Sequence, residues 1–99
     1  MPILAIFTGP ISKDGYESLR KEVDWEHQQP AGGIMHVASF DNDDGIHVAD
    51  VWESGDLMNQ FVNERLMPAM KKLNLPAPKV EVYPTYNINA YSAIDQYKL

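Results

Sequence analysis

Strand-like and helix-like patterns of apolar residues follow one another along this chain in the order β-α-β-β-α-β. Strand-like runs, in which β-branched and aromatic residues alternate with polar ones, cover residues 2–8, 33–41, 46–53 and 79–86. Helix-like runs, in which apolar residues recur three and four positions apart, follow Ser12 and Ser54. This order is the split βαβ, or ferredoxin-like, pattern, in which helices cover one face of an antiparallel sheet. The sequence therefore predicts a ferredoxin-like α+β domain over residues 1–87 and a C-terminal tail over residues 88–99.

Both predicted helices begin at a serine, and the second contains a proline. Ser12 and Ser54 are good N-caps, because a serine hydroxyl can accept a hydrogen bond from the first free backbone N–H groups. The second helix has a wide apolar stripe that includes Phe61 and then reaches Pro68. Because proline lacks a backbone N–H, we expect this helix to end or kink at Pro68, with a short continuation to Leu73.

Composition and charge exclude several classes of partner and site. The chain has 99 residues, 44% of them hydrophobic, which is enough for one small domain with a packed core. Its net charge of −6 argues against nucleic acid or an anionic membrane surface as a partner. The absence of cysteine removes disulfides, thiolate metal sites and a cysteine nucleophile. No run has the length of a membrane span, and the N-terminus reads as a strand rather than a signal peptide, so we expect a cytoplasmic protein.

One face of the predicted sheet has no helix to cover it. That face carries enough apolar side chains that a second copy of the chain is its simplest cover, and the sequence therefore predicts a homodimer. The tail carries Ile88, Tyr91, Ile94 and Tyr97 at helix-like spacing. We expect it to pack on the partner subunit or on the outer helices.

Three segments resemble a known superfamily: PILAIFTGP at the start, HVASFDNDDGIHVADVWES in the hairpin and VEVYPTYN in the last strand. They are similar to the small dimeric α/β-barrel proteins of the antibiotic-biosynthesis-monooxygenase-like superfamily, over roughly residues 2–87. The resemblance implies two ferredoxin-like subunits with facing sheets, and a pocket between sheet and helices in each. In that superfamily the pocket can hold an aromatic substrate that O₂ oxidises without metal or flavin, so no cofactor is expected. Haem-degrading members carry a histidine on the second helix, whereas this chain has none after His47, which argues against haem chemistry.

The segment HVADVWES places an acid inside a strand. If Asp43, Asp44 and a left-handed Gly45 form a three-residue hairpin loop, Ala38 lies opposite Asp50 and His36 opposite Trp52. Side chains alternate along strands, so His36, Asp50 and Trp52 then share one face, with His36 and Asp50 as diagonal neighbours. A loop shorter or longer by one residue would move Asp50 to the other face.

Two interpretations of this cluster remain open. In the catalytic one, Asp50 orients His36, and His36 removes the phenolic proton of an aromatic substrate held against Trp52. The resulting anion then reacts with O₂, or the proton is shuttled in an isomerase-like reaction. In the structural one, His36 and Asp50 satisfy each other, Trp52 is core, and the chain is a non-catalytic small-molecule-binding or regulatory dimer.

Further residues are expected to line the substrate pocket. Phe40 shares the face of His36, Phe61 lies on the apolar stripe of the second helix, and Tyr83 lies in the last strand. The three histidines do not form a recognisable metal site, since His36 and His47 fall on opposite faces of the hairpin. The predicted site therefore has His36 and Asp50 as catalytic residues, no metal, and as substrate-binding residues Trp52, Phe40, Phe61 and Tyr83.

Overall fold

The computed structural model describes all 99 residues and contains the predicted elements in the predicted order. The strands are β1 (Ile3–Gly9), β2 (Gly33–Asn42), β3 (Gly45–Trp52) and β4 (Lys79–Pro84). The helices are α1 (Lys13–Val23), α2 (Gly55–Phe61), the π-helical turn η1 (Val62–Leu66), α3 (Met67–Lys72) and the 3₁₀ turn η2 (Ser92–Gln96).

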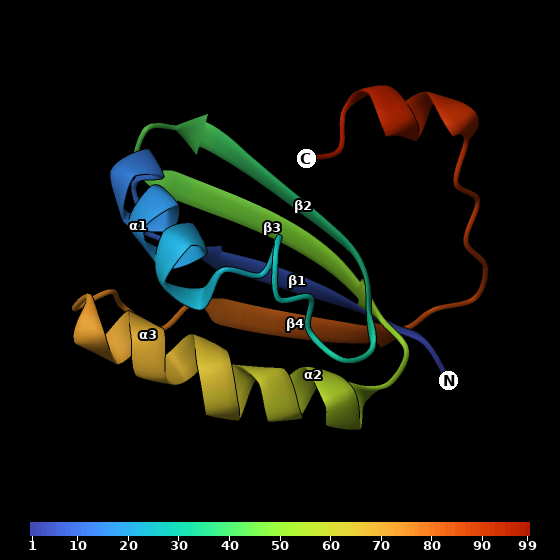
Figure 1. Ribbon diagram of the computed structural model, residues 1–99, viewed down its shortest axis with the longest axis horizontal. Coiled ribbons are helices and arrows are strands. Elements are labelled where there is room, and N and C mark those ends of the chain that lie inside the picture. The colour runs from blue at the N-terminus through green and yellow to red at the C-terminus, as the bar shows by residue number, and fades with distance from the viewer.

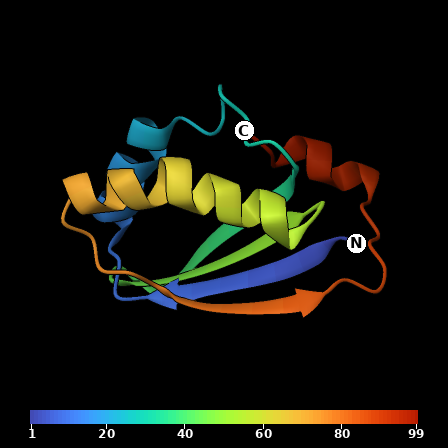
Figure 2. The same ribbon diagram turned by 90° about the horizontal axis from the view of Figure 1, so that it is seen from below.

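The four strands form one antiparallel sheet in the order β2-β3-β1-β4. All helices of the domain lie on one side of this sheet, and the other side is bare (Figures 1 and 2). The arrangement confirms the predicted ferredoxin-like α+β fold. It also places β3, which carries Asp50, in the interior of the sheet.

Both serines cap their helices as the sequence predicts. The Oγ of Ser12 accepts a hydrogen bond from the backbone N–H of Gly15 at 3.0 Å, and the Oγ of Ser54 accepts one from Leu57 at 3.2 Å. At Pro68 the helix changes its winding instead of stopping: α2 passes into the π-helical turn η1, and α3 then begins with the proline in its first turn. The Met67 N–H bonds back to Val62, so the turn before the proline is wound five residues apart.

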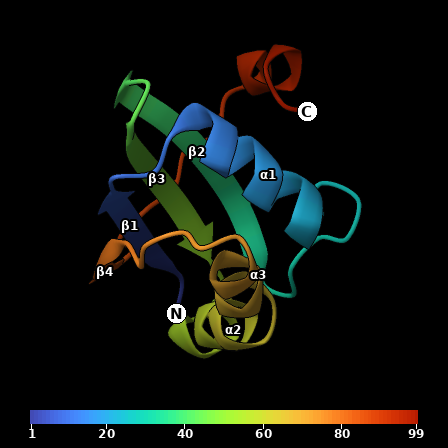
Figure 3. The same ribbon diagram turned by 90° about the vertical axis from the view of Figure 1, so that its left-hand side faces the viewer.

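The hydrophobic core lies between the sheet and the helices. The helix-facing side chains of β1 and β3 meet those of α1, α2 and α3 there, and Figure 3 shows α1 and the α2–α3 run together on one side of the strands. The buried members of this core are Ala5, Phe7, Ile11, Leu19, Val23, Ile46, Val48, Trp52, Met58, Ala69 and Met70.

The hairpin register differs from the prediction by two residues. Gly45 pairs with Asn42 across a two-residue loop, and a bulge between Phe40 and Asn42 then sets Phe40 opposite Ile46. His36 therefore lies directly opposite Asp50, rather than opposite Trp52 as predicted. Because the loop loses one residue and the bulge absorbs another, the two changes together preserve the side-chain face.

The assignment of Gly45 to a left-handed turn position is also wrong. Gly45 belongs to β3, and the only glycine with a positive φ is Gly32, at 83°. A side chain at Gly45 would collide with the carboxylate of Asp41, the residue at the bulge. A substitution at Gly45 therefore needs the exposed Asp41 side chain to move aside, and it meets no special turn conformation.

The bare face of the sheet is apolar, and the tail projects beyond the domain. Met35 and Val37 on β2 point away from the helices and are 36% and 47% exposed. After Pro84 the chain leaves the sheet, and η2 stands away from the helical layer in Figures 1 and 3. Its tyrosines are largely exposed, at 74% for Tyr91 and 81% for Tyr97.

None of the helices combines the length and the apolar character needed to cross a bilayer.

Candidate active site

A cavity of about 250 Å³ opens between the sheet and the helices. Thirteen of its nineteen lining residues are hydrophobic, so the wall suits a flat apolar ligand. The volume lies just below the roughly 300–1,000 Å³ of pockets for drug-sized ligands, which favours a molecule of one or two rings. Its polar and aromatic lining residues are Phe7, Tyr16, Trp25, Gln29, His36, Asp50, Trp52 and Phe61.

A histidine–carboxylate pair forms the polar centre of this cavity. The Nδ1 of His36 lies 2.6 Å from Oδ1 of Asp50, its direct cross-strand neighbour. Asp50 is the one charged residue in the buried set, at 8% exposure, whereas 35% of the His36 side chain is exposed. The pair thus runs from the core to the cavity. With Nδ1–H donated to the carboxylate, the neutral imidazole keeps Nε2 as a hydrogen-bond acceptor.

Tyr16 of α1 occupies that acceptor. Its hydroxyl lies 2.8 Å from Nε2 of His36, and the two ring planes are parallel to within 5°. At this distance the phenol O–H can donate to the Nε2 lone pair. Tyr16, His36 and Asp50 therefore form one continuous chain of hydrogen bonds from the cavity to the core.

Tyr16 and Trp25 are the site residues that sequence reasoning missed. The sequence places Tyr16 in the helix-like run that follows Ser12, where it recurs with Leu19 and Val23 at helical spacing and indicates a core position. The signal that could have singled it out is its hydroxyl, because a tyrosine on a buried stripe needs a partner from the facing sheet. Trp25 follows α1 and lies with its ring centroid 5.3 Å from that of His36.

Burial raises the pKa of Tyr16 to about 12. The guanidinium of Arg20 acts in the opposite direction, and the carboxylates of Glu26, Glu17 and Asp50 add to the increase. The Tyr16 hydroxyl is therefore protonated at neutral pH, which makes it the donor in its bond to His36.

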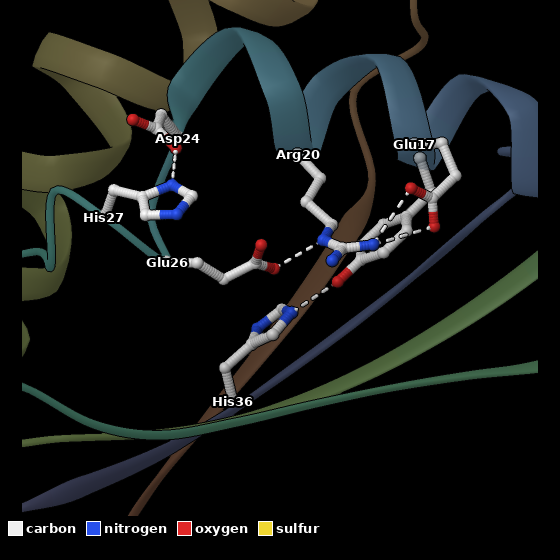
Figure 4. A network of polar contacts seen from close by, with 7 residues as sticks. Glu17, Arg20, Asp24, Glu26, His27 and His36 are labelled. Carbon is white, nitrogen blue, oxygen red and sulfur yellow. Dashed lines mark hydrogen bonds and ion pairs between the residues drawn. The ribbon is translucent and has the colours of Figure 1, made fainter. Parts of the chain in front are cut away.

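Ion pairs surround this site on α1 and the loop after it (Figure 4). Arg20 bonds both Glu17, at 3.0 and 3.1 Å, and Glu26. In the same loop the carboxylate of Asp24 bonds the His27 ring at 2.7 Å, which raises the pKa of His27 and lowers that of Asp24. The charge of Arg20 is thus matched by two carboxylates close to the cavity.

The loop between α1 and β2 forms one wall of the cavity, and Arg65 fixes it. Gln29 and Pro30 line the cavity from this loop. The guanidinium of Arg65, in η1, donates to the backbone carbonyls of Val23 at 3.0 Å and Gln28 at 2.7 Å. The π-helical turn therefore holds the loop at its start and near its middle.

Trp52 is both core and cavity wall. It is 3% exposed, and its ring centroid lies 5.4 Å from that of Phe61 on α2. Its indole Nε1 is buried and has no hydrogen-bond partner. An unpaired buried donor costs free energy. The packing of the Trp52 ring therefore has to offset the cost of its unpaired N–H.

Two of the predicted substrate-binding residues do not line the cavity. Phe40 lies on the predicted face, but it does not line the cavity. Its ring packs edge-on against that of Tyr16, with 5.9 Å between the ring centroids. Tyr83 pairs with Leu4 and points to the bare face of the sheet, where its hydroxyl bonds Glu81 at 2.6 Å. The alternation of β4 determines this, because Val82 and not Tyr83 takes the helix-facing position beside Ala5.

No three His, Asp or Glu side chains converge in a way that could hold a metal ion. The titratable chemistry inside the cavity thus rests on Tyr16, His36 and Asp50, whose hydrogen bonds lead from the cavity to a buried carboxylate.

Comparison with known proteins yields similarity at the level of structure. No family model matches the chain, and no curated protein matches its sequence. A protein of Chloroflexus aurantiacus assigned as an antibiotic biosynthesis monooxygenase superposes with a TM-score of 0.68 at 12% identity, covering 91% of this chain and 98% of that one. This chain has the fold of the antibiotic biosynthesis monooxygenases.

Two further structures extend the likeness to named oxygenases. The cofactor-independent oxygenase SnoaB from Streptomyces nogalater matches with a TM-score of 0.60 at 15% identity, over 88% of this chain and 93% of its own. The monooxygenase from the gene ActVA-Orf6 of Streptomyces coelicolor, in complex with nanaomycin D, matches with a TM-score of 0.61 at 17% identity, over 91% and 92%. The structural comparisons therefore confirm, for the fold, the resemblance found in the sequence.

Proposed function

We propose that this protein binds a small phenol of one or two rings in the cavity and oxidises it with O₂, without metal or flavin. The observation that carries the proposal is the hydrogen-bonded pair of His36 and buried Asp50 at the polar centre of a mostly apolar cavity. A carboxylate that receives the Nδ1–H fixes the imidazole tautomer and stabilises the imidazolium that forms when the ring takes a proton. The fold shared with SnoaB and the ActVA-Orf6 monooxygenase also supports an oxygenase.

The reaction balances with the phenol as its own reductant. Loss of the hydroxyl proton leaves an electron-rich phenolate, which transfers electrons to O₂ and forms a C–O bond at a ring carbon. That carbon then loses its hydrogen, and the O–O bond breaks with release of water. For 1-naphthol the sum is one naphthol plus one O₂ to one naphthoquinone plus one water.

The test uses 1-naphthol as the probe and 1-methoxynaphthalene as its matched control, because the ether has the same rings and no acidic proton. We expect both compounds to raise the melting temperature. A ligand at a hundred times its dissociation constant increases the free energy of unfolding by about 2.7 kcal/mol. Only 1-naphthol should be consumed, with one O₂ taken up for each quinone formed. Binding of 1-naphthol without oxygen uptake would contradict the oxygenase and favour a binding module. An isomerised product without oxygen uptake would favour proton shuttling.

A second part of the proposal is a homodimer joined through the bare face of the sheet. The apolar residues on that face and the exposed aromatic tail are surfaces that a single subunit leaves in water. Charge placed at Val37, which is 47% exposed on this face, should therefore break the association. Removal of residues 88–99 should weaken it.

The measurement is light scattering over a range of micromolar concentrations, with Val37→Glu and the truncated chain beside the wild type. Asn59→Glu is the control, since it adds the same charge to an exposed position on α2. A wild-type chain that stays monomeric would contradict the dimer. An unchanged dissociation constant after truncation would contradict the role of the tail.

A further inference from the structure

The base that the proposed function needs is not free in this structure. Nε2 of His36 is the nitrogen that would accept a substrate proton, and the hydroxyl of Tyr16 lies on it at 2.8 Å. Figure 4 shows His36 reaching from its strand toward the helix that carries Arg20 and Glu17. A phenol in the cavity must therefore either displace Tyr16 or act through it.

Displacement is opposed by the packing of the Tyr16 ring. The ring lies 5.7 Å from that of Trp25 and meets Phe40 edge-on at 5.9 Å, so aromatic neighbours hold it on two sides. Moving it would break these contacts together with the bond to His36. The hydroxyl, by contrast, donates one proton and keeps lone pairs that can accept another hydrogen bond.

We propose that the substrate hydroxyl donates to the Tyr16 oxygen, and that its proton reaches His36 through Tyr16. This inference rests on the proposed function and makes Tyr16 the catalytic residue that touches the substrate. The substrate O–H bond breaks as a new Tyr16 O–H forms, while the old Tyr16 O–H breaks as the Nε2–H of His36 forms. Tyr16 is unchanged at the end, the substrate is a phenolate, and His36 is an imidazolium paired with Asp50.

The surroundings of Tyr16 determine how the proton can move. Its pKa of about 12 makes a free tyrosinate rare at neutral pH, so Tyr16 must accept one proton while it releases the other. The Asp50 carboxylate, 2.6 Å from Nδ1, stabilises the charge that collects on His36. The remaining charged groups near Tyr16 are Arg20, Glu17 and Glu26, and they are paired with one another.

The test removes one hydroxyl. Tyr16→Phe keeps the ring and its aromatic contacts, and Tyr16→Met serves as a second variant without the hydroxyl. The probe is 4-nitrophenol, whose phenolate is coloured, so the ionised fraction of bound probe is read from absorbance without any need for O₂. Tyr91→Phe is the control, because it removes a tyrosine hydroxyl from a side chain that is 74% exposed in the tail.

At a pH well below the pKa of free 4-nitrophenol, a relay predicts that wild type and Tyr91→Phe bind the probe as phenolate, while both Tyr16 variants bind it as the neutral phenol. Turnover of 1-naphthol should fall by about 10²–10⁴-fold in Tyr16→Phe, the range for loss of a proton-transfer group. The double variant Tyr16→Phe/His36→Ala should be no slower than either single variant, since the residues act as one unit.

Three results would overturn the relay: a Tyr16→Phe variant that ionises 4-nitrophenol as well as wild type, one that turns over 1-naphthol at the wild-type rate or faster, or a wild type that does not ionise the bound probe. Ionisation of 4-nitrophenol that depends on Tyr16, but without oxygen uptake from 1-naphthol, would leave the relay standing and refute only the oxygenase.

Discussion

Replacing His36 with alanine is expected to lower the turnover of 1-naphthol by about 10²–10⁴-fold, the usual contribution of a general base. The side chain carries both contacts of the hydrogen-bond chain, to Tyr16 on one nitrogen and to Asp50 on the other. Its loss leaves the substrate proton without an acceptor and a buried carboxylate without its donor. Steady-state oxygen uptake, followed together with quinone formation, measures the effect.

Asp50→Asn should cost less than His36→Ala. The asparagine carbonyl can still accept from Nδ1–H and keep the imidazole oriented, while the charge that stabilises the imidazolium is gone. His27→Ala is the matched control, because that histidine also pairs with an aspartate but is 81% exposed in the loop. Full activity in His36→Ala, with only a lower melting temperature, would show that the pair is structural.

Replacing Trp52 with alanine is expected to lower the free energy of unfolding by about 3–5 kcal/mol, the range for large aromatic residues in cores. Trp52 is 3% exposed and packs on Phe61, so truncation leaves a void between β3 and α2. Small domains have a total stability of about 5–15 kcal/mol, so this single change removes a large share of it. Urea denaturation with the midpoint and slope fitted together measures the loss.

Trp52→Phe separates the packing of the ring from the cost of its unpaired N–H. Phenylalanine keeps most of the apolar contact and removes the donor that has no partner, so we expect a clearly smaller loss than for alanine. Gln60→Ala serves as the control, since that side chain is exposed on α2, away from the proposed interface, and its change should stay within about 0.5 kcal/mol. A loss below about 1 kcal/mol for Trp52→Ala would contradict its place in the core.

The turn between β2 and β3 shows where local sequence rules stop. A three-residue loop ending in a left-handed glycine is a reasonable interpretation of Asn42–Gly45, yet the chain closes with two residues and adds a bulge. The Asn42 side chain accepts from the backbone N–H of Asp44 at 2.8 Å, which supports the tighter loop. Loop and bulge each shift the register by one residue in the same direction, so the total shift of two residues preserves the predicted face although the predicted pairing was wrong.

The sequence by itself determined the order of the elements, their caps and the face that each hairpin side chain takes. These properties are local: the periods of two and 3.6 residues, the serine hydroxyls next to free N–H groups, and the alternation that sets His36 and Asp50 on one face. The predicted α+β fold follows from them, and so does a carboxylate on an interior strand. What they cannot provide is which residue from another element faces that pair.

Only the tertiary structure decided that the partner is Tyr16. It lies twenty residues before His36 and on a helix, so the contact depends on how α1 crosses the sheet and on the rotation of its stripe. The same packing set Phe40 against Tyr16 and off the cavity wall, and the register of β4 with β1 set Tyr83 on the bare face. The physical reason is that a hydrogen bond between elements needs their relative placement to within tenths of an ångström, which core packing determines and residue spacing does not.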